Sequence, residues 1–111
     1  MARIGRDEVE AAYFTVLRAR EKVGELRRYE EFLHDERRRL QRFVADGDAL
    51  DAHVQPKLRR KLKHTDDPLG AVLRARHEVI DAELARVPDQ IQAAEAFADE
   101  AQAEHERLRR A

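Results

Sequence analysis

The chain lacks the residues on which several common functions depend. It contains no cysteine and no serine, which excludes disulfides, thiolate metal sites and a serine or cysteine nucleophile. Its few glycines do not form a glycine-rich phosphate loop. No apolar run is long enough for a membrane span or for the core of a signal peptide. We therefore expect a cytoplasmic protein without enzymatic activity, cofactor or membrane association.

Charged residues and alanine dominate the composition instead. Charged residues make up 41% of the chain and aromatic residues only 5%, which is too polar for a thick spherical core. The combination of alanine, glutamate and arginine is typical of long helices and coiled coils. The 111 residues therefore predict one all-α domain whose core is a narrow seam.

A heptad pattern predicts a first helix over about residues 6–46. Its apolar residues fall in two slots three positions apart, which hold Val9, Val16, Val23 and Val44, and Ala12, Ala19, Leu26, Leu33 and Leu40. Glu30 and Arg37 take two of the valine slots, where polar residues can fix the register. A helix of about 40 residues is roughly 60 Å long, so it needs a second long helix to cover its apolar stripe.

A second heptad pattern predicts such a helix over about residues 68–110. One slot holds Leu73, Ile80, Val87, Ala94, Ala101 and Leu108, and the other holds Gly70, His77, Leu84, Ile91, Ala98 and His105. Capping side chains at residues 65–67, followed by Pro68, predict its start. Pro88 interrupts the pattern without changing its phase, which predicts a kink or a brief break at Val87.

A basic connector is expected between the two helices, over about residues 47–67. Gly47, between two aspartates, is suited to end the first helix in a left-handed conformation. A spacing of four predicts a short helix, or two interrupted at Pro56, from Leu50, Val54, Leu58 and Leu62. We expect the basic side chains to contact a partner's acidic groups or phosphates: Lys57, Arg59, Arg60, Lys61 and Lys63. Alternatively, the leucines make the connector a cap on the end of the helices.

Two such helices joined by this connector predict a long antiparallel hairpin that is coiled-coil-like. In this register Phe14 and Phe97 fall at the same level, outside the seam. With Tyr13 and Leu17 they form more apolar surface than a monomer usually leaves exposed. We therefore expect a homodimer, in which these four residues join two hairpins into a four-helix bundle.

Acidic and histidine side chains at helical spacing raise the possibility of a metal site. Glu30, Glu31 and His34 have the Glu-x-x-His spacing of carboxylate-bridged sites in helical bundles, and His77 with Asp81 falls at a similar level. Such sites use a second Glu-x-x-His copy, which the second helix lacks. The favoured interpretation is a polar seam layer of Glu30, Arg37 and His77 that forms hydrogen bonds across the helices.

The basic connector also raises nucleic-acid binding as an alternative. Its five Lys and Arg residues can neutralise phosphates, but no aromatic residue lies among them to stack on bases. A pI near 6.5 is also far from that of a dedicated nucleic-acid binder. The segment is too short, and too poor in aromatic residues, for a helix that lies on a membrane surface.

Part of the first predicted helix resembles the helical-hairpin anti-sigma proteins of actinobacteria that bind cyclic di-GMP. The resemblance starts from residues 23–28, Val-Gly-Glu-Leu-Arg-Arg. In that family each of two helices carries a spaced set of Glu, Ser, Arg, Gln and Asp. The positions that match are Arg27, Asp35 and Asp81, and those that depart from the set are Arg20, Gly24 and Glu31. The resemblance implies a hairpin-shaped regulator, and nucleotide binding is not carried over.

Together, these patterns predict a non-enzymatic helical interaction or regulatory protein that binds another macromolecule through its surface and its basic connector. Three alternatives follow from the same residues. They are a nucleic-acid-binding protein, an anti-sigma-like transcription regulator and a metal-binding bundle protein.

Overall fold

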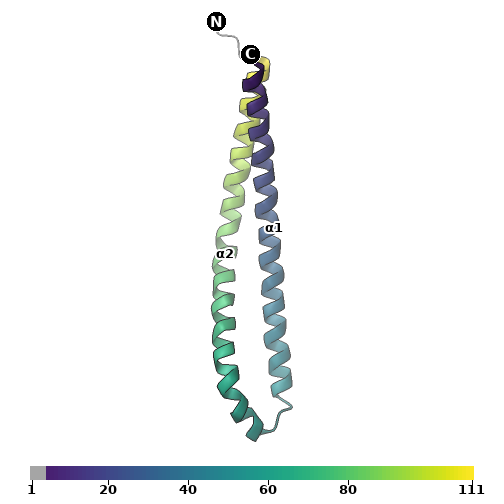
Figure 1. Ribbon diagram of the computed structural model, residues 1–111, viewed down its shortest axis with the longest axis vertical. Helices are drawn as coiled ribbons and strands as arrows, with labels where there is room; N and C mark the ends of the chain where they lie inside the picture. The colour runs from purple at the N-terminus through teal and green to yellow at the C-terminus, as the bar shows by residue number, and fades with distance from the viewer. Residues whose placement is uncertain (1–4) are drawn as a thin grey trace. The chain divides into compact units, whose positions relative to one another are not determined.

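The structure is a computed structural model that describes residues 5–111. They form two helices, α1 over Arg6–Asp51 and α2 over Pro56–Arg110, joined by a short turn (Figure 1). No strand occurs within residues 5–111. The all-α class predicted by the heptad patterns is therefore confirmed.

The helix ends near the turn correct the sequence-based expectation. α1 continues past Gly47 to Asp51, and α2 begins at Pro56 instead of near Pro68. No glycine between residues 5 and 111 has a positive φ, so Gly47 does not form a left-handed helix end. Proline fits the first position of a helix, where its missing N–H has no intrahelical partner to lose. The connector expected over about residues 47–67 is thus a turn of residues 52–55 flanked by helix.

Arg59 closes this turn from the first residues of α2. Its Nη2 donates hydrogen bonds to the carbonyl oxygens of Asp51, at 2.7 Å, and Val54, at 3.3 Å. The backbone N–H of Val54 in turn donates to the carbonyl of Asp51 at 3.1 Å. Carbonyl groups at and after a helix C-terminus lack intrahelical donors. Arg59 therefore supplies a donor to the Val54 carbonyl and a second donor, beside the Val54 N–H, to the Asp51 carbonyl.

Helix α2 continues through Pro88. Residues on both sides of Pro88 remain helical, so the brief break considered at Val87 is absent. Proline removes one hydrogen bond of the helix interior without necessarily ending the helix. The predicted kink stays a prediction.

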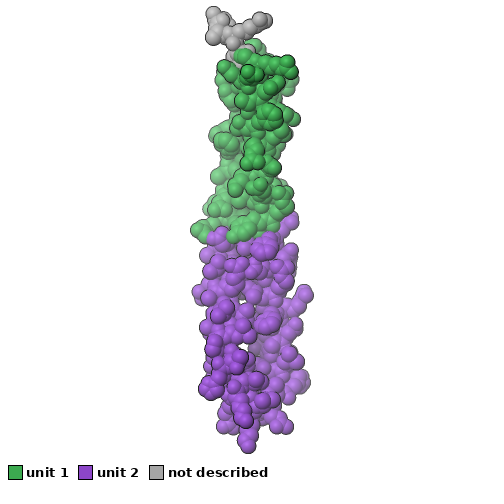
Figure 2. Space-filling view, in the orientation of Figure 1, with its two compact units in different colours: residues 1–30, 86–111 green, residues 31–85 purple. Residues whose placement is uncertain are grey.

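The residues divide into two compact units (Figure 2). Unit 1 comprises residues 5–30 with Arg86–Ala111, and unit 2 comprises Glu31–Ala85. Each unit pairs a segment of α1 with an antiparallel segment of α2. In unit 1 the order of the contacts shows this direction, since Arg20 contacts Gln102 and Arg27 contacts Glu95. Unit 2 contains the turn and is therefore a helical hairpin.

The core of unit 1 follows the predicted seam. Its buried residues are Val16, Ala19, Val87, Ala101 and His105. His105 takes an apolar slot, and the centre of its ring lies 5.5 Å from that of Tyr13. Because valine and alanine are small, this seam is thin and the aromatic side chains beside it remain exposed.

The core of unit 2 is confined to the end away from the turn. Leu33 and Ile80 are buried there, at 2% and 0% exposure. Val44, although it holds a seam slot, is 45% exposed. Closer to the turn, continuing the heptads by steps of seven places charged side chains in four of the five helical seam slots between Gly47 and Gly70, and the fifth is Pro56 at the start of α2. The charged four are Asp51, Arg59, Lys63 and Asp66. The helices near the turn therefore have no apolar seam between them.

Candidate functional site

The basic segment at the start of α2, residues 57–63, carries the most concentrated free charge in the described chain. Lys57, Arg60, Lys61 and Lys63 are all exposed, and none has an ion-pair partner among residues 5–111. Lys57, Arg60 and Lys61 share one helix face because they are spaced by three and four residues. Arg59, which was expected to contact a partner, instead donates to the carbonyls of the turn.

The charges beside the turn oppose the dipoles of both helices. α1 has no basic residue in its last turn and ends with Asp48 and Asp51, whereas α2 has no acidic residue in its first turn. The outer ends follow the usual rule, with Asp7 and Glu8 starting α1 and three arginines ending α2. Each misplaced charge costs roughly 0.3–1 kcal/mol of helix stability. Charges that oppose the dipoles beside the turn do not stabilise the isolated chain, which indicates that these side chains have another role.

Exposed leucines accompany these charges. Leu50 is 69% exposed, Leu58 is 51% exposed, and Leu62 is 36% exposed. Because these side chains face solvent, they do not form the capping layer considered from their spacing. They leave apolar surface directly beside the free cations.

A groove lies between the two helical segments of unit 2, and its volume is about 530 Å³. Its apolar lining consists of Leu40, Phe43, Val44, Leu69 and Leu73. Gly47 and Gly70 also line it and supply no side chain to fill it. A Cβ built on Gly47 would meet nothing within 4 Å, and one on Gly70 would meet only the Arg74 guanidinium, at 3.4 Å. The groove is therefore a gap in the seam that can accept apolar side chains.

Carboxylates line the part of this groove nearest the turn. They belong to Asp48, Asp51 and Asp66. None of these three carboxylates forms an ion pair within the described residues. Sequence reasoning did not find the groove, although two glycines in seam slots were a signal for it.

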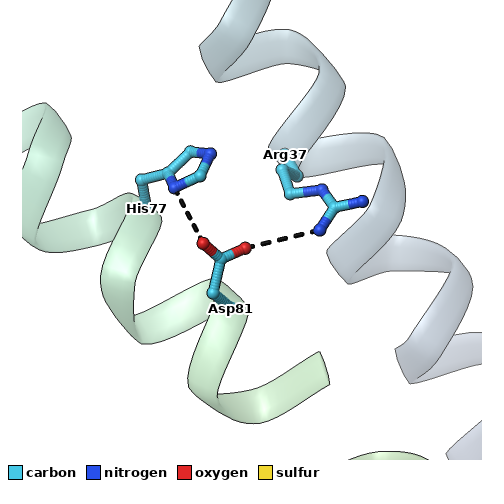
Figure 3. A network of polar contacts seen from close by, with 3 residues as sticks. All are labelled: Arg37, His77 and Asp81. Carbon is cyan, nitrogen blue, oxygen red and sulfur yellow. Dashed lines mark hydrogen bonds and ion pairs between the residues drawn. The ribbon is translucent and has the colours of Figure 1, made fainter. Parts of the chain in front are cut away.

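A polar cluster replaces the proposed metal site (Figure 3). Asp81 accepts from Arg37 Nη1 at 3.4 Å through one oxygen and lies 3.1 Å from His77 Nδ1 through the other. Arg37 comes from α1 and the other two from α2, so Arg37 links the helices as the polar-layer interpretation predicts, whereas the contact of His77 is with Asp81 of its own helix. Glu30, which was considered for the same site, belongs to unit 1. Among the described residues, no three His, Asp or Glu side chains are arranged to hold a metal ion.

Ion pairs join the two helices across the seam in each unit. In unit 2, Arg76 donates to both oxygens of Glu36, at 2.7 and 2.8 Å. These hydrogen bonds hold the pKa of the Glu36 carboxyl below its ordinary value of 4.5. In unit 1, Arg27 pairs with Glu95. The sequence did not reveal these pairs because they depend on the register between the helices.

An apolar patch, defined as Tyr13, Phe14, Leu17 and Phe97, lies on unit 1. The four side chains are 40–61% exposed. Phe14 and Phe97 line one hollow together with Ala93 and Ala94, so the prediction that they fall at the same level is confirmed. A second hollow in unit 1 has a mixed lining, with Val23 and Ala98 beside the polar side chains of Arg20, Arg27, Glu95, Asp99 and Gln102.

Comparison with known proteins does not assign these surfaces. No protein-family model matches the chain, and no curated protein or solved structure matches it either. Neither α1 nor α2, within residues 5–111, is long and apolar enough to cross a bilayer.

Proposed function

We propose that the protein is a non-enzymatic helical interaction module that binds another macromolecule through the basic segment. The observation that carries this proposal is the set of four free, exposed cations in the first two turns of α2, the first of which, Lys57, opposes the helix dipole. Such charges contribute little to the stability of the hairpin, and they remain available to acidic groups of a partner.

Exposed leucines favour a protein as the partner over a nucleic acid. Leu58 and Leu62 lie among the cations, and phosphates offer nothing for these side chains to contact. A nucleic acid remains the second candidate because Lys57, Arg60 and Lys61 share one face of the helix. A salt titration against generic DNA and RNA separates the two. A linear loss of affinity with the logarithm of salt concentration indicates a nucleic-acid binder, whereas no binding at low salt removes this candidate.

We also propose that two copies associate through the apolar patch of unit 1 to form a four-helix bundle. Burying each large side chain contributes roughly 1.5–3 kcal/mol, which favours covering Phe14 and Phe97. The small residues Ala93 and Ala94 in the hollow between them would let a helix of the second copy approach closely.

The test of the interaction module is charge reversal in the basic segment. Partners that co-purify with the wild-type protein from its host are expected to be lost from the Arg60→Glu, Lys61→Glu variant. The matched control reverses two adjacent exposed arginines elsewhere, Arg109→Glu with Arg110→Glu, and changes the net charge equally. Retention of every partner by the first variant would overturn the proposal.

A further inference from the structure

Residues 43–72 of unit 2, here called the turn region, carry two sets of charged side chains without ion-pair partners in the described chain. The two sets have opposite sign. The acidic set lines the groove and consists of Asp48, Asp51 and Asp66. The basic set lies on the first turns of α2 and consists of Lys57, Arg60, Lys61 and Lys63. Both sets lack ion-pair partners within the described residues. A partner that satisfies only one set leaves the other unexplained.

We propose that the turn region of unit 2 binds the turn region of a second copy of the chain. The basic segment of each copy lies along the groove of the other, with Leu58 and Leu62 in contact with the apolar lining. The cations of one copy then face the carboxylates of the other. This inference rests on the proposed role of the basic segment as a binding element, and it names the partner of that segment.

The charge pattern favours a second copy over other partners. An acidic protein or a nucleic acid would satisfy the basic set, but it would add negative charge beside Asp48, Asp51 and Asp66. A second copy supplies both signs, because a two-fold axis makes every contact occur twice. The arrangement also accounts for the reversed dipole rule at both helix ends beside the turn.

Exposed apolar surface around the turn supports the same contact. The large apolar side chains left exposed there are Phe43, Val44, Leu50, Leu58, Leu62, Leu69 and Val72. A soluble monomer seldom exposes so many within one short region. The gap left by Gly47 and Gly70 gives leucine side chains from a second copy a place to insert.

A charge-swap experiment tests the proposal directly. One variant, called the basic variant, carries Asp48→Lys, Asp51→Lys and Asp66→Lys. The other, called the acidic variant, carries Lys57→Glu, Arg60→Glu, Lys61→Glu and Lys63→Glu. Lysines at the C-terminus of α1 and glutamates at the N-terminus of α2 have the sign that each helix dipole favours. Both variants are therefore expected to keep the helical content of the wild type. Circular dichroism checks this, and native mass spectrometry of differently tagged copies measures association.

The expected result is a preference for mixed pairs. Each variant alone repels its own kind at the turn, whereas a mixed pair restores opposite charges at both contacts. Mixed pairs should therefore exceed the half expected for random pairing. If copies associate only through the apolar patch of unit 1, the mixture gives random pairing and overturns the inference. A monomeric wild-type protein at micromolar concentration overturns it as well.

A groove-filling variant keeps the test decisive if charge swapping disturbs folding. Gly47→Leu adds a side chain where nothing lies within 4 Å of the new Cβ, so helicity should be kept while association at the turn is lost. Unchanged association of this folded variant would contradict the inference. The two proposals fail separately. Random pairing, together with loss of a co-purified partner from the acidic variant, overturns this inference and keeps the proposed function. Retention of every co-purified partner by the acidic variant overturns the proposed function.

Discussion

Arg76 of α2 donates two hydrogen bonds to the carboxylate of Glu36 on α1, at 2.7 and 2.8 Å. The Glu36 side chain is only 20% exposed, less than any other residue in the ion pairs of the described chain for which an exposure is given. Two parallel bonds between a guanidinium and a carboxylate fix geometry as well as charge. This pair therefore holds Glu36 and Arg76 at one level of the two helices in unit 2.

The pair makes the stability of the protein depend on pH. Its hydrogen bonds lower the pKa of Glu36 from 4.5, so the stabilisation is complete above 4.5 and is lost as pH falls through the lowered pKa of the folded state. We expect Glu36→Gln to be less stable than wild type at neutral pH, and the difference to shrink on acidification. Melting temperatures measured from neutral to strongly acidic pH check this.

Glu31→Gln is the control for this measurement, because Glu31 is exposed and has no ion-pair partner within the described residues. It should leave the pH dependence close to that of the wild type. Parallel curves for wild type and Glu36→Gln would show that the pair does not contribute.

The turn provides a second prediction, on Arg59. Arg59→Ala removes the donors to the carbonyls of Asp51 and Val54, and it should lower the free energy of unfolding by about 0.5–1.5 kcal/mol. Urea unfolding followed by circular dichroism measures the change. Arg60→Ala, one residue further on, removes a free cation and should change stability far less. Equal effects of the two substitutions would refute the structural role of Arg59.

The core of unit 2 gives the largest expected change in stability. Ile80 is fully buried, so Ile80→Ala should cost about 2–5 kcal/mol through lost burial and a residual cavity. Val79 is its neighbour in the sequence and is 50% exposed, so Val79→Ala is the matched control with a much smaller cost. Thermal or urea unfolding compares the two variants. A cost at Val79 similar to that at Ile80 would mean that the heptad assignment is shifted.

Self-association through unit 1 is tested at the two phenylalanines of its patch. Phe14→Glu with Phe97→Glu should keep the chain helical and shift it to monomer, because two charges would be buried in the contact. Sedimentation equilibrium measures the mass of the particle. Phe32→Glu is the control, since Phe32 is 49% exposed but lies in unit 2. A wild-type protein that is already monomeric at micromolar concentration would contradict self-association through unit 1.

The apolar periodicity predicted the core because it depends only on spacing. Val16 and Ile80 are buried as their heptad slots require, and Arg37, a seam residue without an apolar side chain, forms a polar contact between the helices. These features repeat along the chain, so one sequence is sufficient to find them.

The helix ends and the groove could not be predicted in the same way. Cap signals at Gly47 and Pro68 are local, and the helices pass through both positions. Continuing a helix adds one hydrogen bond for each residue other than proline, which favours extension beyond such signals. The groove arises because Gly47 and Gly70 line the same part of unit 2, which depends on where the chain reverses. The sequence predicted a connector of about 20 residues, whereas the structure has a turn of residues 52–55. These two connections place different side chains opposite each other.

Gly47 allows the two descriptions of this region to be separated by one substitution. In a left-handed helix end, Gly47→Ala would be destabilising, because alanine avoids a positive φ. In the structure Gly47 is helical and a Cβ there meets nothing within 4 Å, so Gly47→Ala should raise the free energy of unfolding by about 0.5–1 kcal/mol. Gly24→Ala is the comparison, since a Cβ at Gly24 contacts the Arg28 guanidinium at 3.4 Å and should give a similar or smaller gain. A loss of stability at Gly47 alone, measured by urea unfolding, would place the end of α1 there and not at Asp51.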